Sequence, residues 1–479
     1  MRDKIKKLEN VSRILDSSQD QRDQWNSEVL RYANRFINQL DQTKAYIDSK
    51  NNEEQDPHWQ ISEKATDLEQ LLKSTTTYID NIGINPASGG HMGYIPGGGL
   101  YPSALGDYIA AVSNRYAGVY FAAPGAVSLE NRLIRWMCDL IGFPSTALGN
   151  LTSGGSIANL IAVVTAREAF YIKARDIEKM VIYLSEQAHH SVQKALRIAG
   201  LAEAQLRYIP LDEGLRLCVP ALEDAIIEDK KNGLKPFFIN ASFGTTNTGA
   251  IDPMIPIAAL AKKYQLWFHV DASYGGFFKL VPELASKFKG IEMADSVTLD
   301  PHKTLFLPFG TGAILIKDTK KLLEAHHYLA DYMQDTIDES YEVSPADVSP
   351  ELTKHFRGMR LWLPLKLYGL EPFRAALEEK LYLTRYFYQE IQKSCGFETG
   401  PDPELSVAMF RYIPTEGDAN YFNKMLIHSI QKDGRAFLSS TTINGVFWIR
   451  VAIVIFRTHL KQIDLLLQII QEKVAELSE

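Results

Sequence analysis

The segment 300–303, Asp-Pro-His-Lys, places Lys303 between two short apolar runs, 296–299 and 313–316. Both runs predict buried strands, because they are apolar and bounded by Pro, Gly or polar residues. An ammonium group in a turn between two core strands loses hydration, which favours the neutral amine, a nucleophile towards carbonyl groups. A lysine near a strand end is more often a surface residue, so the interpretation depends on its neighbours.

Three other polar residues follow predicted strands. His189 follows the predicted strand 181–184, Thr246 follows 236–242, and Asp271 follows 266–270. Predicted helices alternate with these strands, which is typical of a mostly parallel sheet with helices on both faces. Ligands of such folds bind at the carboxyl ends of the strands, so the sequence predicts that all three residues lie near Lys303.

A candidate phosphate site comes earlier in the chain. Gly155 and Ser156 stand immediately before an apolar helical run, 157–169. The free N–H groups of a helix N-terminus, together with a Ser hydroxyl, bind phosphate well. Taken alone this signal is weak, because Ser-Gly-Gly is also an ordinary turn before a helix cap.

Pyridoxal phosphate would use each of these groups. A lysine holds its aldehyde as a Schiff base, a carboxylate keeps its pyridine nitrogen protonated, an imidazole stacks on its ring, and the glycine turn binds its phosphate. A Rossmann dehydrogenase would need a glycine fingerprint that is absent. A zinc site is not expected either, because the adjacent histidines 189–190 and 326–327 point away from each other on a helix.

Each residue also has a purely structural interpretation. Asp271 suits a helix cap, Thr246 suits a turn, and His189 suits a hydrogen-bonded core position. In isolation those interpretations are the more probable ones. Their common position after successive strands is what favours a shared site.

Four motifs, in this order, resemble the group II amino-acid decarboxylases of the fold type I pyridoxal phosphate superfamily, among them the aromatic-L-amino-acid decarboxylases. The motifs are Gln187-Ala-His189, Phe243-Gly-Thr-Thr246, His269-Val-Asp271-Ala-Ser-Tyr274 and Asp300-Pro-His-Lys303. The similarity extends from about residue 80 to the C-terminus, where Arg450-Val-Ala-Ile and Arg457-Thr resemble the family's small domain.

The resemblance implies a role for each residue at the site. Those roles are Schiff-base formation for Lys303, pairing with the pyridinium nitrogen for Asp271, ring stacking for His189, contact with the phenolic oxygen for Thr246, a place beside the Schiff base for His302, and phosphate binding for Gly155 and Ser156. It also implies that Tyr332, in a polar segment at about 331–354 that is typical of a lid, protonates the substrate carbon after carbon dioxide leaves.

The expected function is decarboxylation of an aromatic or bulky L-amino acid to its amine, through Schiff-base and quinonoid intermediates. Alternatives are another pyridoxal phosphate reaction, namely aldehyde-forming oxidative decarboxylation, transamination or carbon–carbon cleavage, and a catalytically inactive scaffold on the same fold. Two positions depart from the family pattern: Asp300 replaces an asparagine, and Thr304 replaces a tryptophan. An ionised Asp300 beside a phosphate is unfavourable, so we expect it to hydrogen-bond to backbone or hydroxyl groups.

Composition limits the partners and the location. The 479 residues carry a net charge of −7 without a strongly basic stretch, so nucleic acid and anionic membranes are not expected partners. Three scattered cysteines and the absence of a signal peptide or a membrane-spanning run favour a reducing, cytoplasmic location.

The chain divides into three predicted parts. Residues 1–90 form a helical segment, 91–360 a large α/β domain of the fold type I, pyridoxal phosphate-dependent transferase type, and 361–479 a small α+β domain ending in a hairpin and a helix. Within these, 85–99 is a Gly/Pro-rich connector or pocket wall. Apolar residues from Trp25 to Leu40 recur at helical spacing and predict a stripe that packs on its own chain or on a second subunit. The resemblance implies a homodimer with active sites at the subunit interface.

Overall fold

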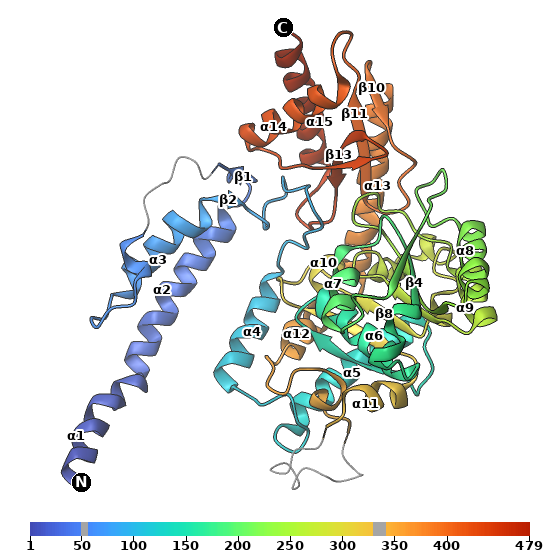
Figure 1. The fold of residues 1–479 in the computed structure, drawn as a ribbon. Helices are drawn as coiled ribbons and strands as arrows, with labels where there is room; N and C mark the ends of the chain where they lie inside the picture. Colours follow the sequence, from blue (N-terminus) through green and yellow to red (C-terminus); the bar gives the residue numbers. More distant parts are fainter. Residues whose placement is uncertain (49–55, 329–341) are drawn as a thin grey trace.

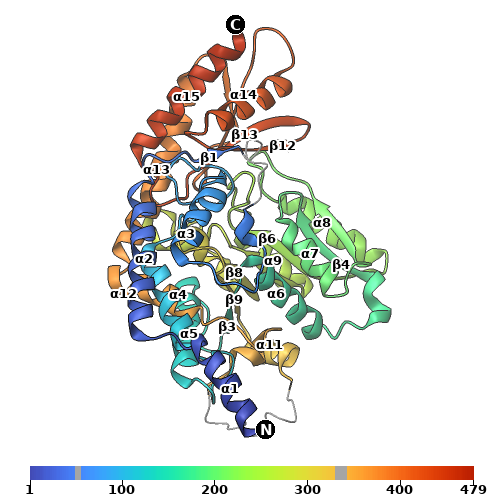
Figure 2. The same ribbon diagram turned by 90° about the vertical axis from the view of Figure 1, so that its left-hand side faces the viewer.

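The computed structural model describes residues 1–48, 56–328 and 342–479, and shows three regions (Figure 1). N-terminal helices stand beside a large α/β domain, and a smaller α+β domain carries the C-terminus. A second view shows that the two termini lie at opposite ends of the molecule (Figure 2).

A seven-stranded sheet organises the large domain, in the order β3-β9-β8-β7-β6-β4-β5. Neighbouring strands from β8 to β5 are parallel, whereas β9 is antiparallel to both β3 and β8. The strands are β3 (Leu148–Thr152), β4 (Met180–Ser185), β5 (Gln205–Ile209), β6 (Lys235–Ser242), β7 (Trp267–Asp271), β8 (Ser296–Leu299) and β9 (Gly312–Ile316). The predicted, mostly parallel sheet is confirmed, and each strand predicted here forms within one residue of its expected bounds.

Two apolar cores lie on opposite faces of this sheet. Alternate residues of β4 divide between them, since Val181 and Tyr183 belong to one core and Ile182 and Leu184 to the other. Helices α5, α8 and α9 cover the first face, and α6, α7 and α11 cover the second. The helices around the sheet are α4 (Tyr101–Ser113), α5 (Pro124–Ile141), α6 (Gly155–Ala169), α7 (His190–Ile198), α8 (Val219–Lys231), α9 (Met254–Tyr264), α11 (Thr319–His326) and α12 (Gly358–Tyr368). With both faces covered, the carboxyl edge of the parallel strands is the natural place for a ligand.

The small domain is an antiparallel sheet with helices packed against it. Its strands, in the order β10-β11-β13-β12, are β10 (Phe397–Thr399), β11 (Val407–Tyr412), β13 (Val446–Ala452) and β12 (Ser439–Ile443), and its helices are α13 (Glu371–Lys393), α14 (Ala419–Asp433) and α15 (Leu460–Ser478). The predicted hairpin turns at Asn444 and Gly445, both with positive φ (50° and 78°), the conformation that two-residue hairpin loops require.

The N-terminal region is helical, as predicted, but it contributes almost nothing to the core. It consists of α1 (Arg2–Ser12), α2 (Gln19–Asn38) and α3 (Leu68–Thr75), with a two-stranded ribbon of β1 (Tyr46–Ile47) and β2 (Gly83–Ile84). None of these helices contains a buried residue. Trp25 and Val29 of the apolar stripe remain 41% and 46% exposed, whereas Leu40, just after α2, is buried. The N-terminal end of the stripe is therefore exposed, whereas Tyr32 and Phe36, nearer its C-terminal end, are partly covered.

Several other features bear on the site. Within the described ranges, no helix is long and apolar enough to cross a membrane. No group of three or more His, Cys, Asp or Glu side chains in those ranges is arranged to hold a metal ion. The three cysteines, Cys138, Cys218 and Cys395, are free thiols.

Candidate active site

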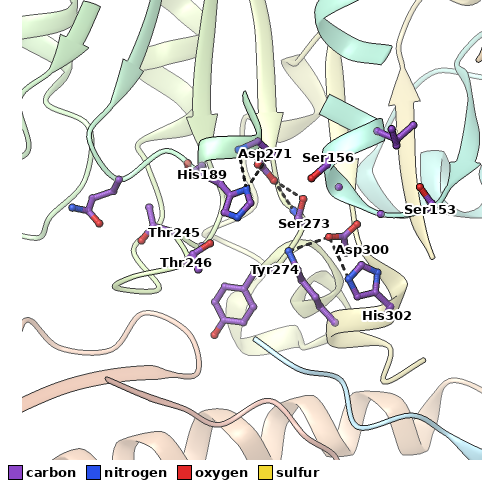
Figure 3. A pocket seen from close by; sticks show the side chains of 18 residues that line it. Ser153, Ser156, His189, Thr245, Thr246, Asp271, Ser273, Tyr274, Asp300 and His302 are labelled. Carbon is purple, nitrogen blue, oxygen red and sulfur yellow. Dashed lines mark hydrogen bonds and ion pairs between the residues drawn. The ribbon is translucent and has the colours of Figure 1, made fainter. Parts of the chain in front are cut away.

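A cavity of about 310 Å³ opens at the carboxyl ends of β6, β7 and β8, a volume within the range of small-molecule sites. Its lining comes from the loops after five strands and from the N-terminus of α6. Seven of the predicted site residues line it: Gly155, Ser156, His189, Thr246, Asp271, His302 and Lys303. Figure 3 shows His189, Thr246, Asp271 and His302 around this one space. The eighth, Tyr332, lies outside the described residues.

Lys303 lies between strands β8 and β9, as predicted, and the turn that carries it is a single turn of helix, α10 (Pro301–Thr304). Pro301 begins that turn, which suits its fixed φ. The Lys303 side chain is 20% exposed, and its Nζ lies 3.0 Å from Oδ2 of Asp300. The carboxyl group of Asp300 makes no hydrogen bond to a backbone or hydroxyl group among the described residues, so that expectation was wrong, and its Oδ1 has no partner there.

Asp271 ends β7 and is held by donors on both carboxylate oxygens. Its Oδ1 accepts from the N–H (3.1 Å) and hydroxyl (2.6 Å) of Ser273, and its Oδ2 accepts from Nδ2 of Asn159 (3.0 Å). Burial alone raises the pKa of this carboxyl group, but the charge of Lys303 and these hydrogen bonds outweigh burial and lower the pKa below its usual value. Asp271 is therefore an anion fixed in place at the cavity.

Asn159 is a functional residue that sequence reasoning missed. Its amide donates to Asp271 and to Oγ of Ser191 (2.9 Å), and its Oδ1 accepts from Nε2 of His269 (3.1 Å) and from Thr298 (2.7 Å). All four hydrogen bonds of the amide are thus made inside the core. Its position three residues after Ser156, one turn along the same helix, was the available signal.

His269 contacts Asn159 on the side away from Asp271, through the Asn159 Oδ1 atom. Burial lowers its pKa to about 4, so the ring is neutral at neutral pH. Because its Nε2 faces the acceptor Oδ1 of Asn159, we assign the proton to Nε2, and Nδ1 then accepts from the hydroxyl of Ser296 (2.8 Å). The Ser296 oxygen in turn accepts from Trp267 (2.8 Å). The resulting chain of donors ends at Asp271.

His189 caps α7, as its position after β4 allows. Its Nδ1 accepts from the N–H of Ser191 (3.3 Å) and lies 2.7 Å from the Ser191 hydroxyl. Burial is the main cause of its lowered pKa. Since Ser191 also contacts Asn159, one network orients both His189 and Asp271.

The turn before α6 forms an anion cradle. Gly154 has φ 152°, and a Cβ at Gly155 would lie 2.7 Å from Oγ of Ser273 and 2.9 Å from Oδ2 of Asp300, so a larger residue at Gly155 would displace these two side chains. The first N–H groups of α6 have no acceptor within the helix, and the helix dipole adds positive charge there. Ser153 and Ser156 bring hydroxyl groups to the same end of the cavity (Figure 3).

Two segments distant in sequence close around the site. Gly97, in the predicted connector, approaches the backbone of α10 so closely that a Cβ there would lie 2.3 Å from the carbonyl oxygen of His302. Arg450, on β13 of the small domain, donates to the carbonyl oxygens of Thr246 and of Asn247, the latter at 2.7 Å. Arg450 was recognised only as part of a family motif; its contact with the Thr246 loop follows from the tertiary structure.

The residues fit pyridoxal phosphate. The glycine cradle suits a phosphate, Asp271 suits a protonated ring nitrogen, and Lys303 opens into the same cavity as a nucleophile. His302 donates from Nδ1 to the carbonyl oxygen of Thr311 (2.6 Å), and burial lowers its pKa, so its ring is neutral beside Lys303.

Comparison with known proteins gives concordant results. The model of the pyridoxal-dependent decarboxylase conserved domain matches residues 50–413. The chain is 34% identical over 403 residues to the aromatic-L-amino-acid decarboxylase of Bacillus atrophaeus, which covers 83% of this chain and 84% of that protein. It is 30% identical over 407 residues to the phenylacetaldehyde synthase of Petunia hybrida, with coverage of 81% and 80%.

The fold also has solved counterparts. The crystal structure of Oryza sativa TDC with PLP and tryptamine superimposes with a TM-score of 0.91, covering 97% of this chain and 99% of that one at 22% identity. This likeness confirms the predicted fold type I architecture.

Proposed function

This chain belongs to the pyridoxal-dependent decarboxylase family, and on that premise we propose that its substrate is an aromatic or similarly bulky L-amino acid, which it converts to the amine and carbon dioxide. The observation that carries the proposal is the convergence of Lys303, Asp271 and His189 on one cavity beside a glycine cradle. The aromatic substrate class rests on the similarity to the Bacillus atrophaeus decarboxylase.

Each residue has a distinct task in this reaction. When bound, pyridoxal phosphate supplies the electron sink that accepts the electrons of the breaking Cα–carboxylate bond. Asp271 holds a proton on the ring nitrogen, because its anionic state is stabilised by Ser273, Asn159 and Lys303. Lys303 attaches the cofactor and exchanges with the substrate amine. With the cofactor bound, His189 would cover the ring, Thr246 would lie at the phenolic oxygen, and Gly155 and Ser156 would hold the phosphate.

The test is a spectrum followed by a product screen. The purified protein should show a visible absorbance band that shifts with its substrate, and one aromatic amino acid should yield carbon dioxide and the amine. A band without carbon dioxide release from any amino acid would favour transamination or carbon–carbon cleavage. No band after addition of pyridoxal phosphate would contradict the cofactor assignment.

Aldehyde formation is the second candidate, because a phenylacetaldehyde synthase is among the relatives at 30% identity. We propose Tyr332 as the residue that separates the two outcomes, by returning a proton to Cα. The Tyr332→Phe variant should then lose amine and form aldehyde. Amine as the only product, at an unchanged rate, would show that Tyr332 is not the proton donor.

A homodimer is proposed as the working form. The exposed apolar side of α2, with Trp25, Val29 and Leu30, is not covered by its own chain. Helix α4 likewise exposes Ile109 and Val112. Burial of such faces between two chains removes apolar area from water. Light scattering should give twice the chain mass, and charged substitutions at Trp25 and Val29 should shift it towards the monomer.

A cytoplasmic location is proposed from the cysteines, all three of which are free in the structure. Free thiols are typical of reducing compartments. Cell fractionation tests this, and recovery in an extracellular fraction would contradict it.

A further inference from the structure

Asp300 stands where an anion is to bind. It is 1% exposed, and its carboxyl oxygens lie against two glycines, Gly155 of the cradle and Gly312 at the start of β9. A Cβ at Gly155 would lie 2.9 Å from its Oδ2, and a Cβ at Gly312 would lie 2.7 Å from its Oδ1. Figure 3 shows Asp300 between Ser273 and His302, at the same end of the cavity as Ser156.

The two oxygens of this carboxyl group have different surroundings. Oδ2 pairs with Nζ of Lys303 at 3.0 Å, whereas Oδ1 has no hydrogen-bond partner within the described part of the chain. A buried carboxylate oxygen without a donor is costly. The cost is greater beside a bound phosphate, because like charges repel strongly away from water.

Lys303, the partner of Asp300, carries a proton that it must lose before it can react. Its ammonium group must lose a proton before the nitrogen can attack a carbonyl carbon. In the described part of the chain, Asp271, His189 and His302 lie around this pair, and Arg360 lies beside His302. Asp271 is held as an anion by its own donors, and burial keeps His189 and His302 neutral, with Nε2 of His302 3.8 Å from Asp300. Arg360 is paired with Asp107. The nearest proton acceptor to Lys303 is therefore Oδ2 of Asp300.

We propose that Asp300 takes the proton of Lys303 when the cofactor binds, and that the neutral carboxyl group then donates a hydrogen bond to the phosphate. One N–H bond of Lys303 breaks and one O–H bond of Asp300 forms, so no proton is gained from or lost to solvent in this step. A carboxylic acid held neutral in order to donate has precedent in enzyme sites. This inference rests on the proposed function, since it assumes that pyridoxal phosphate occupies the cavity.

Infrared difference spectroscopy tests the proton position directly. Addition of pyridoxal phosphate to cofactor-free protein should produce the C=O stretch of a protonated carboxyl group, and the band should be absent from the Asp300→Asn difference spectrum. Asp252 provides the matched control, because this buried carboxyl, whose pKa burial raises to about 6, lies outside the cavity. The Asp252→Asn variant should keep the difference band. Its absence from the wild-type protein, with cofactor bound, would overturn the proposal.

Equilibrium binding gives a second readout. The affinity of Asp300→Asn for pyridoxal phosphate should stay within about threefold of wild type, because the amide also donates a hydrogen bond. Asp300→Ala should bind it about 10- to 100-fold more weakly, since a hydrogen bond to a charged group is lost. Affinity for pyridoxal, which lacks the phosphate, is the reference, because both substitutions also remove the group that takes the proton of Lys303. The loss caused by Asp300→Ala should be larger for pyridoxal phosphate than for pyridoxal.

Tighter binding of pyridoxal phosphate by the variants would indicate that Asp300 stays ionised. Removal of a carboxylate charge would make both Asp300→Asn and Asp300→Ala bind pyridoxal phosphate more tightly than wild type, and that result would overturn the proposal. Failure of the cofactor assignment, on which this inference rests, looks different, because neither wild-type protein nor any variant would then bind pyridoxal phosphate. Circular dichroism confirms that each variant is folded before its affinity is interpreted.

Discussion

Lys303 and Lys354 are both largely withdrawn from solvent in the large domain, yet their surroundings are opposite. The Lys354 side chain is 0% exposed, and its Nζ donates to Glu130 (2.8 Å), Asn150 (2.8 Å) and the carbonyl oxygen of Leu151 (3.1 Å). Among the residues that the structure describes, Lys303 has one side-chain partner, Asp300, and it also lines the cavity. All three N–H groups of the Lys354 ammonium thus donate hydrogen bonds, whereas only Asp300 accepts from the Lys303 ammonium among the described residues.

The difference shows that burial alone does not mark a reactive lysine. A lysine with a full set of acceptors stays charged and links elements, here the segment before α12 to α5 and β3. A lysine with one exchangeable partner beside an open cavity is able to release its proton and attack a carbonyl group. Substitutions at the two lysines, and at two residues of the hydrogen-bond network that holds Asp271, test this difference between a reactive and a structural site.

The largest expected effect is that of Lys303→Ala on catalysis. Removal of the group that attaches the cofactor should lower the decarboxylation rate by more than about 10³-fold, the scale seen when a nucleophile is removed. The visible absorbance band should disappear while the circular dichroism spectrum keeps its native form. A rate within tenfold of wild type would contradict the role of Lys303.

Lys354→Met should instead affect stability. It leaves the Glu130 carboxylate, 2% exposed, without its counter-charge, which costs about 3–5 kcal/mol of unfolding free energy. Urea denaturation measures this loss, and folded protein should keep the visible band. Oε1 of Glu130 also accepts from the N–H of Gly358, so the double variant Glu130→Gln/Lys354→Met should recover part of the loss. An unchanged denaturation midpoint would show that Lys354 has no structural role.

Asn159→Ala should have an intermediate effect on catalysis. Loss of its hydrogen bond to the Asp271 carboxylate should lower the rate by about tenfold. It also removes one of the interactions that lower the pKa of Asp271, so that pKa rises and the acid limb of the pH–rate profile moves to higher pH. A slower variant with an unshifted acid limb would mean that Asn159 acts only through packing.

The smallest effect is expected for His269→Gln, which should change how the free energy of unfolding depends on pH. The pKa of His269 is about 4 in the folded chain and 6.5 ordinarily, so the unfolded state binds a proton in this interval that the folded state does not. Stability should therefore fall as pH decreases from about 6.5, and His269→Gln should remove about 1–2 kcal/mol of that fall by pH 5. The lowered pKa of Asp271 acts in the same direction, but only below about pH 4. If the free energy of unfolding fell equally steeply with decreasing pH in the wild type and in His269→Gln, the lowered pKa of His269 would be contradicted.

Much of the site followed from the order of residues along the chain. Strands end where polar residues begin, and the carboxyl ends of parallel strands share an edge, so His189, Thr246, Asp271 and Lys303 were expected together. Asn159 was missed because a polar residue inside a helix has no local feature that reveals which strand it faces. The apolar stripe from Trp25 was interpreted correctly as helical, but its exposure depends on what the rest of the chain covers.

The sequence by itself determined the α/β class and the strand positions, and it predicted Lys303 as the reactive lysine, because these inferences depend on local apolar periodicity and on motif order. Only the tertiary structure decided what surrounds each charged group: the full set of acceptors at Lys354, the hydrogen bonds that hold Asp271 as an anion, and the Asp300 oxygen that has no partner among the described residues. Charge states depend on burial and on partners within a few ångströms. Those partners come from segments as distant as β3 and the chain before α12, which meet only when the sheet and its two covering layers have formed.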